Sequence, residues 1–228
     1  WDSLAAPLIE GADPTMWTLS GFADEIADAL HEQIALVTEL GLKYIEFRSA
    51  WGLNVLDLDD AQLQRAKESL DAAGLGVSSI GSPIGKIGIN DDNEPHLDRT
   101  RHAAAVAKFF GAPFIRMFSY FVPEGDDPDG YRDEVIRRLR QLADIAEELG
   151  VTMIHENEKD IFGDIPRRCL DIVESVNSPA LKLTWDNANF VQCGVRPFDE
   201  GYALLSPHVV YLQVKDARFS DNVVVPAG

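Results

Sequence analysis

The chain has 228 residues, and 46% of them are apolar, so it is long enough to bury a sizeable core in one large domain or two small ones. Its formal net charge is −18, from 20 Lys and Arg against 38 Asp and Glu, so repulsion from phosphate argues against a nucleic-acid partner. The sequence has no run of 18 apolar residues, so we expect neither a transmembrane helix nor a membrane partner.

The two cysteines, Cys169 and Cys193, are too few and too isolated for a disulfide framework or a zinc knuckle. Two free thiols are typical of a reducing compartment. No signal peptide is visible either, and we therefore expect a cytoplasmic protein.

One structural unit recurs along the chain: an amphipathic helix, a glycine or proline stop, an apolar strand and a polar strand end. In the first copy, residues 29–50, the apolar residues of the helix fall on one face, at Leu30, Ile34, Val37 and Leu40. Gly41 then serves as the C-cap, because its missing Cβ permits the left-handed conformation. Further copies occupy residues 66–83, 103–120, 135–158, 169–190 and 201–217.

The helix stops expected from this pattern are Gly41, Gly74, Gly111, Gly150, Pro179 and Pro207. They follow one another at intervals of 28 to 39 residues, which leaves room for one βα unit each. Together with an earlier strand at residues 17–26, the pattern predicts seven strands that alternate with helices. Strict alternation predicts a parallel sheet with helices outside it.

An open doubly wound sheet and a (β/α)8 barrel both satisfy this alternation. A doubly wound nucleotide-binding sheet carries a glycine-rich phosphate loop after its first strand, whereas SGFADEIAD (residues 20–28) has no G-x-G-x-x-G. Polar residues instead close almost every strand, as in a barrel with its site at the C-terminal face. We therefore predict an α/β fold of the (β/α)8 TIM barrel class. The prediction is a single domain over residues 1–228, whose eighth βα unit is missing from this chain.

The expected strand ends carry polar side chains, in chain order Asp24 and Glu25, Glu46 and Arg48, Ser82 and Lys86, Arg116 and Ser119, His155 to Glu158, Asp186, Asn187 and Asn189, and Gln213, Lys215 and Asp216. In a barrel these residues converge on one mouth. Crowded carboxylates repel one another unless a cation lies among them, and oxygen donors suit Mg²⁺ or Mn²⁺. Glu156, Asp186 and Gln213 hold equivalent positions on consecutive strands, 30 and 27 residues apart.

Several stretches resemble the sugar phosphate isomerase/epimerase group of the xylose-isomerase-like TIM barrels, namely HENEKDIFGD, WDNANFVQCG, YLQVKDA and VVPAG, with SPIGKIG and IRMFSY. The resemblance runs from about residue 18 to the end of the chain. It implies one divalent metal at the barrel mouth, held by a Glu, an Asp, a His and a Glu at the ends of strands five to eight. The first two are Glu156 and Asp186, the third falls on Gln213 where the family usually has His, and the fourth would follow residue 228.

Gln213 leaves three interpretations open. Its carbonyl oxygen coordinates the metal as a neutral and weaker ligand, which favours Mg²⁺ or Mn²⁺ while Zn²⁺ or Co²⁺ stays possible. Alternatively, Gln213 binds the substrate and the metal takes a water instead, or the site has lost its metal.

The resemblance implies a metal-dependent isomerase or epimerase of a small-molecule sugar or sugar phosphate. The reaction would be a proton transfer through an enediolate held on the metal, with Glu156 as the catalytic base. One alternative is a keto-inositol-type dehydratase that uses the same metal enolate, and the other is a non-catalytic sugar-binding barrel with a degraded metal site. Relatives are often dimers or tetramers, so a homo-oligomer is considered by analogy.

The candidate substrate-binding residues are Glu46, Lys86, Arg116, Glu158, Asn189, Lys215 and Arg218. The basic residues among them could equally form salt bridges at the rim, and Glu158 is a competing base that falls in the loop after its strand. We expect His155 to point away from Glu156 and to be packed or hydrogen-bonded. Residues 160–167 and 188–202 are expected to be loops over the mouth.

Overall fold

The computed structural model describes residues 17–227 and divides into two compact units. Among the described residues, unit 1 comprises residues 17–82 and 102–115, and unit 2 comprises residues 83–101 and 116–227. The expectation of a single domain stays a prediction. No helix among the described residues is long and apolar enough to cross a membrane.

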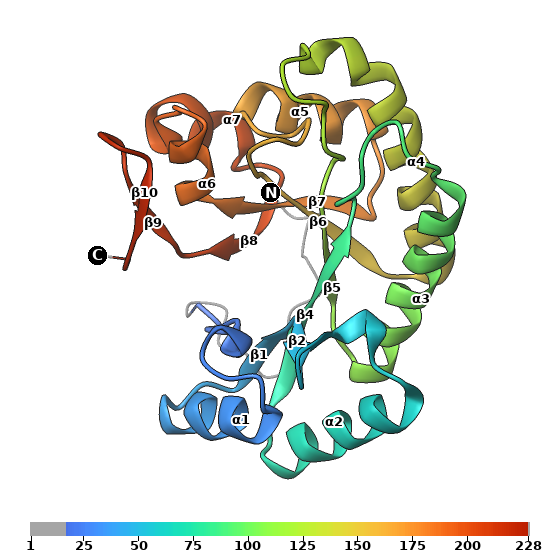
Figure 1. Cartoon of the computed structure of the whole chain (residues 1–228), viewed down its shortest axis with the longest axis vertical. Helices are drawn as coiled ribbons and strands as arrows, with labels where there is room; N and C mark the ends of the chain where they lie inside the picture. Colours follow the sequence, from blue (N-terminus) through green and yellow to red (C-terminus); the bar gives the residue numbers. More distant parts are fainter. Residues whose placement is uncertain (1–16, 228) are drawn as a thin grey trace. The chain divides into compact units, whose positions relative to one another are not determined.

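Six strands form the main sheet, in the order β1-β4-β5-β6-β7-β8 (Figure 1). Their bounds are β1 (Tyr44–Phe47), β4 (Gly76–Ile84), β5 (Phe114–Met117), β6 (Thr152–Glu156), β7 (Leu181–Asp186) and β8 (Val209–Gln213). The β1–β4, β6–β7 and β7–β8 pairs are parallel. The order follows the chain without the reversal of a doubly wound sheet, so six of the seven expected strands are confirmed in the arrangement of a (β/α)8 barrel.

Helices separate these strands: α1 (Leu30–Glu39), α2 (Asp60–Ala72), α3 (Glu94–Phe110), α4 (Arg132–Leu149), α5 (Pro166–Val176), α6 (Asn187–Gln192) and α7 (Ala203–Leu205). Short helical turns are η1 (Ala23–Glu25), η2 (Val55–Asp57), η3 (Pro128–Tyr131) and the π-helical η4 (Pro197–Tyr202). Two antiparallel hairpins join β2 (Ser49–Ala50) to β3 (Leu53–Asn54) and β9 (Asp216–Arg218) to β10 (Val223–Val225).

The glycine stops behave as the sequence predicts. Gly41, Gly74, Gly111 and Gly150 have φ values of 72°, 67°, 69° and 64°, respectively. This is the left-handed conformation that ends many helices and that glycine adopts without strain because it has no Cβ. The expected stop at Pro179 is displaced, because α5 ends at Val176 and Asn177 takes the left-handed position with φ 50°.

The strand predicted at residues 17–26 is wrong. Within the described chain this segment contains only the helical turn η1, and Trp17 and Leu19 are 79% and 65% exposed. Gly21 accepts a backbone hydrogen bond from Glu46 at 3.0 Å, so the segment touches β1. Asp24, one of the polar residues at the end of this segment, forms an ion pair with Arg48 at 2.7 Å.

The segment 188–202 is also not a simple loop. Most of α6 and all of η4 lie within it, and Asp186 caps α6 by accepting a hydrogen bond from the Asn189 backbone at 2.8 Å. An aspartate at the N-cap is a strong local start signal for a helix. Asp186 therefore has a structural role in addition to the metal-binding role that the sequence predicts.

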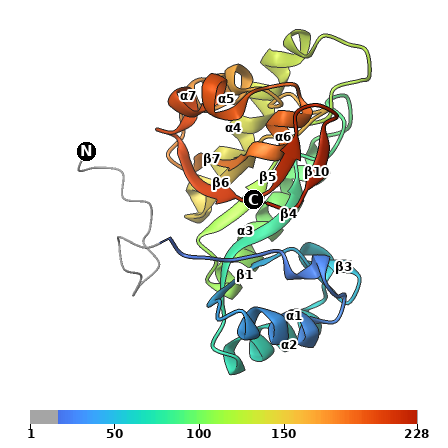
Figure 2. The ribbon, with the colours of Figure 1, turned by 90° about the vertical axis from the view of Figure 1, so that its left-hand side faces the viewer.

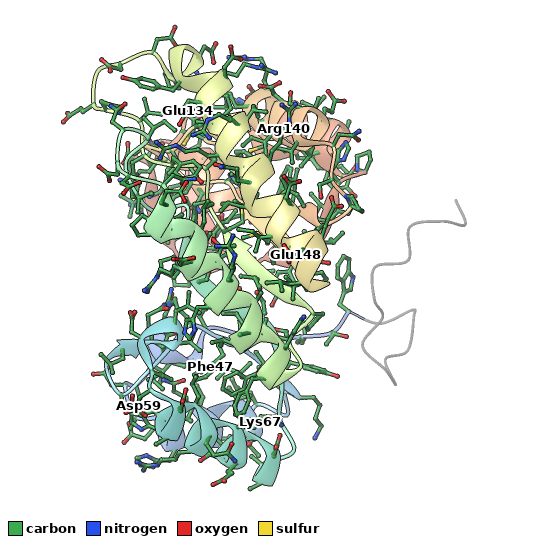
Figure 3. All side chains as sticks on the ribbon, turned by 90° about the vertical axis from the view of Figure 1, so that its right-hand side faces the viewer. Phe47, Asp59, Lys67, Glu134, Arg140 and Glu148 are labelled. Atoms are coloured by element: carbon green, nitrogen blue, oxygen red, sulfur yellow. The ribbon has the colours of Figure 1, made fainter. Side chains whose placement is uncertain are left out.

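Unit 1 has an apolar core in which Phe47, fully buried at the end of β1, packs edge-on against Phe110 with ring centroids 5.2 Å apart. Its helix α2 begins with a capping box, in which Asp59 and Gln62 exchange hydrogen bonds. Figure 3 labels Phe47 and Asp59 in this unit.

In unit 2, β6 and β7 lie side by side as Figure 2 shows, with α4 and α5 packed against each other. Helix α4 buries one face and exposes another, where Arg140 and Glu148 are labelled in Figure 3. Strand β6 is buried over its last four residues, Met153 to Glu156. A carboxylate at the end of such a strand is therefore held in a low-dielectric interior.

Candidate functional site

Three predicted metal ligands occupy the ends of neighbouring strands in unit 2. Asp186 on β7 pairs in register with Gln213 on β8, and Glu156 on β6 pairs with Thr184, two residues before Asp186. Side chains alternate along a strand, so Glu156, Thr184, Asp186 and Gln213 point to the same face of the sheet.

Glu156 is 6% exposed and is held from two sides. Arg116 donates from Nη1 to one Glu156 oxygen at 3.2 Å, and Asn189 donates from Nδ2 to the other at 3.1 Å. Burial raises the pKa of Glu156, while the Arg116 charge opposes the rise. Arg116, predicted as a substrate-binding residue, is thus the immediate partner of the predicted base.

Asp186 is also buried and has a structural and an electrostatic role. Its Oδ1 accepts the Asn189 backbone N–H at 2.8 Å, and its Oδ2 lies 3.1 Å from Lys215 Nζ. Burial raises the pKa of Asp186, against the hydrogen bond from Asn189 and the charge of Lys215. Asn157 clamps the Asp186 backbone with two hydrogen bonds, at 2.8 and 3.0 Å.

Asn189 connects the two carboxylates. It donates to Glu156 and to the Asn157 carbonyl, and its own Oδ1 accepts a hydrogen bond from Lys215 Nζ at 2.7 Å. We name the connected set the strand-end cluster, which consists of Arg116, Glu156, Asp186, Asn189, Gln213 and Lys215.

The amide of Gln213 faces Glu156. One of its terminal atoms lies 3.1 Å from both Glu156 oxygens. With the nitrogen in that position the amide donates to both oxygens. With the carbonyl oxygen there, three oxygens gather at this separation, which is costly unless a cation lies among them.

Lys86 and Glu158 form a second pair near the cluster. Their ion pair is 2.7 Å long, and Lys86 Nζ lies 4.2 Å from the centre of the Phe118 ring, over which Arg116 also lies at 5.0 Å. Glu158 lies beyond the end of β6, in the loop where the sequence placed it. Both cations therefore lie against the Phe118 ring, and each is paired with a glutamate.

Two predicted substrate-binding residues have other surroundings. Glu46 lies in unit 1, buried at the end of β1. Arg218, on β9, pairs with Asp221 at 2.7 Å across the turn of its hairpin. Their roles in substrate binding stay predictions.

His155 is packed and hydrogen-bonded, as expected. It is fully buried, its Nε2 lies 2.9 Å from Ser119 Oγ, and burial lowers its pKa to about 3. Gly163 lies so close that an added Cβ would be 2.3 Å from the imidazole ring, so this position requires glycine. Gly163 N–H also donates a hydrogen bond to Ser119 Oγ at 2.7 Å, which holds the loop after β6 against His155.

The sequence named Asn157 among the strand ends but gave it no role. In the structure its amide fixes the backbone of Asp186 and thereby sets the position of a neighbouring strand end. The only local signal was an amide directly after a buried glutamate.

The donor chemistry of Glu156, Asp186 and Gln213 fits a hard divalent cation, because it offers two carboxylates and one amide oxygen. The described residues contain no group of three or more His, Cys, Asp or Glu side chains that could hold a metal ion. The predicted set contributes only two such side chains, Glu156 and Asp186, because its third member is Gln213.

The family model for the xylose isomerase-like TIM barrel matches residues 34–225, and the chain belongs to this family. The (β/α)8 TIM barrel fold and the resemblance drawn from the sequence motifs are thereby confirmed. The metal ligands and substrate-binding residues inferred from that resemblance stay predictions.

Among characterised proteins the chain is similar to the 3-dehydroshikimate dehydratase of Bacillus anthracis, with 21% identity over 187 residues. The match covers 82% of this chain and 66%, just under two thirds, of that relative.

Two solved structures illustrate the shared fold. A xylose isomerase-like TIM barrel protein from Mycobacterium smegmatis in complex with magnesium has a TM-score of 0.72 and 22% identity, over 92% of this chain and 80% of that one. A D-tagatose 3-epimerase-like protein has a TM-score of 0.71 and 16% identity, over 89% and 78%.

Proposed function

We propose that this chain is a metal-dependent isomerase or epimerase of a sugar or sugar phosphate, in which a carboxylate moves a proton next to a carbonyl. The observation that carries the proposal is that Glu156 and Asp186, both buried, share one face of the sheet with Gln213. Burial raises the pKa of Glu156 above its ordinary value, and a raised pKa suits a carboxylate that takes and returns a proton.

Glu156, Asp186 and the carbonyl oxygen of Gln213 are the residues that would hold the cation, and hard donors favour Mg²⁺ or Mn²⁺ over Zn²⁺ or Co²⁺. A cation bound there supplies stabilisation of the negative charge that develops on a substrate oxygen. The magnesium complex of the related M. smegmatis protein supports a divalent metal.

Glu156 is the proton-transfer group of this proposal. Hydrogen bonds from Arg116 and Asn189 to its two oxygens fix the plane of the carboxylate. A fixed base takes the proton without first paying for orientation. Lys86 and Lys215, whose side chains are 32% and 39% exposed, are the cations proposed to bind hydroxyl or phosphate oxygens of the substrate.

The test is proton exchange. The purified protein with Mg²⁺ or Mn²⁺ is incubated in D2O with a panel of ketoses and ketose phosphates, and deuterium at the carbon next to the carbonyl is measured by NMR. We expect incorporation that EDTA abolishes and added metal restores. Absence of exchange across the panel, in protein that is folded and metal-loaded, contradicts the proposal.

A dehydratase is the second candidate, favoured by the similarity to 3-dehydroshikimate dehydratase. The same glutamate would remove the proton, but a hydroxyl at the adjacent carbon would then leave as water. Formation of a conjugated product from an inosose or from 3-dehydroshikimate, followed by ultraviolet absorbance, separates the two reactions. Ligand binding without either reaction would instead support a non-catalytic sugar-binding barrel.

The predicted cytoplasmic location and the homo-oligomer considered by analogy stay predictions, as does the expected lack of a nucleic-acid partner.

A further inference from the structure

Resting on the proposed function, we propose that Lys215 competes with the divalent cation for Asp186 and thereby sets the metal affinity of the site. The inference concerns one oxygen atom, Asp186 Oδ2, which the ammonium group of Lys215 approaches to 3.1 Å.

The two carboxylate oxygens of Asp186 have different partners. Oδ1 accepts the backbone N–H of Asn189 at 2.8 Å and caps helix α6. Using Oδ1 for a metal would weaken that cap, so Oδ2 is the oxygen left for a cation. Lys215 Nζ already lies at Oδ2.

Lys215 is linked to the second predicted ligand as well. Its Nζ donates to Asn189 Oδ1 at 2.7 Å, and Asn189 Nδ2 donates to Glu156 at 3.1 Å. The lysine therefore orients the amide that holds Glu156. A dication bound to both carboxylates would meet the ammonium group at close range, and like charges at such distances repel strongly even when partly screened.

The two cations of the cluster differ in how easily they can leave. The Lys215 side chain is 39% exposed, whereas the Arg116 side chain beside Glu156 is 10% exposed. A partly exposed ammonium on a flexible stem can turn to water at low cost. Lys215 is thus the displaceable cation, and once displaced from Asp186 it becomes free to reach a substrate oxygen.

The substitution of Gln213 for an imidazole ligand strengthens the effect. A neutral amide oxygen gives the metal little to offset the repulsion, so the affinity depends more on the charges around the carboxylates. Lys215 is in this sense a positioning residue of the metal site.

The experiment compares Mn²⁺ affinity by isothermal titration calorimetry in the wild type, Lys215→Met and Lys215→Arg. We expect Lys215→Met to bind Mn²⁺ about 10-fold tighter or more, because a positive charge is removed. Lys215→Arg keeps the charge and should stay near the wild type. Lys159→Met, which removes an exposed lysine three residues after Glu156, is the matched control and should leave the affinity unchanged.

Thermal unfolding supplies a second readout. Metal-free Lys215→Met should melt below the wild type, since Asp186 loses its counter-charge, and Mn²⁺ should raise its melting temperature more than it raises that of the wild type. A lysine with a merely structural role would lower the melting temperature and leave the shift caused by Mn²⁺ unchanged.

Equal or weaker Mn²⁺ binding by Lys215→Met, with binding by the wild type, overturns this inference and leaves the proposed metal site standing. Absence of Mn²⁺ binding by both proteins overturns the metal site and the inference together. Binding by Lys215→Met alone supports the inference in its strongest form.

Discussion

Carboxylates paired with arginine occur in two regions of unit 2, and their pKa values move in opposite directions. In the strand-end cluster, burial raises the pKa of Glu156 although Arg116 lies 3.2 Å away. On the surface of helix α4, hydrogen bonds from Arg137 at 2.7 Å help to lower the pKa of Glu134 to about 2.

The difference shows that the partner does not decide the protonation behaviour of a carboxylate, because desolvation can outweigh a neighbouring cation. The surface pair joins two residues of one helix and contributes little to stability. The buried pair keeps a carboxylate whose proton affinity is increased, which is a costly arrangement that suits proton transfer.

The largest effect is expected for Glu156→Gln. The amide keeps the shape but cannot take a proton, so turnover should fall by about 10²-fold to 10⁴-fold. Deuterium exchange and circular dichroism would check activity and fold. Glu134→Gln is the matched control on the surface and should retain full activity. Wild-type activity in Glu156→Gln would remove Glu156 from the mechanism.

The next effect is acid destabilisation through His155 on the other face of β6. Its pKa is about 3 in the folded protein and is about 6.5 in an unfolded chain, so the unfolded state binds the proton first. The contribution of His155 to the free energy of unfolding is therefore fully present above about pH 6.5 and is lost as the pH decreases towards 3. The loss is about 2 kcal/mol between pH 6.5 and 5.

Urea denaturation at a series of pH values measures this loss. His155→Gln should flatten the profile, whereas His31→Gln, at an exposed position of α1, should not. An unchanged profile in His155→Gln would mean that other groups cause the acid sensitivity.

A smaller effect separates the two roles of Asp186. Asparagine caps helices as well as aspartate does, so Asp186→Asn should lose metal affinity with the cap of α6 retained. Asp186→Ala should lose both, and should be about 1 kcal/mol less stable than Asp186→Asn. Calorimetry with Mn²⁺ and urea unfolding measure the two quantities. Equal stability of the two variants would show that the cap contributes nothing.

The smallest effect is expected in the surface region itself. Arg137→Gln, which removes the exposed partner of Glu134, should reduce the free energy of unfolding by less than about 1 kcal/mol, and the reduction should shrink in high salt because exposed ion pairs are screened. Urea unfolding at low and high NaCl would measure it. A larger loss that salt does not change would show that the α4 pairs behave like the buried cluster.

Much of the fold follows from local pattern. The glycine stops at Gly41, Gly74, Gly111 and Gly150 mark helix ends because only glycine takes the left-handed conformation without strain. Period-two alternation places Glu156, Asp186 and Gln213 on one face of the sheet. The sequence itself determined the order of the elements and the face on which the candidate ligands lie.

Tertiary structure decided which groups are partners. Lys215 and Arg116, for which the sequence leaves substrate binding and salt bridges open, lie beside Asp186 and Glu156, and Asn189 joins the two carboxylates. No periodicity encodes such contacts, since they depend on side chains brought together from separate strands and on the burial around them. The same reason explains why residues 17–26 form no strand. Their pattern predicts one, but a strand also needs a neighbouring strand to pair with, and the local pattern does not encode that pairing.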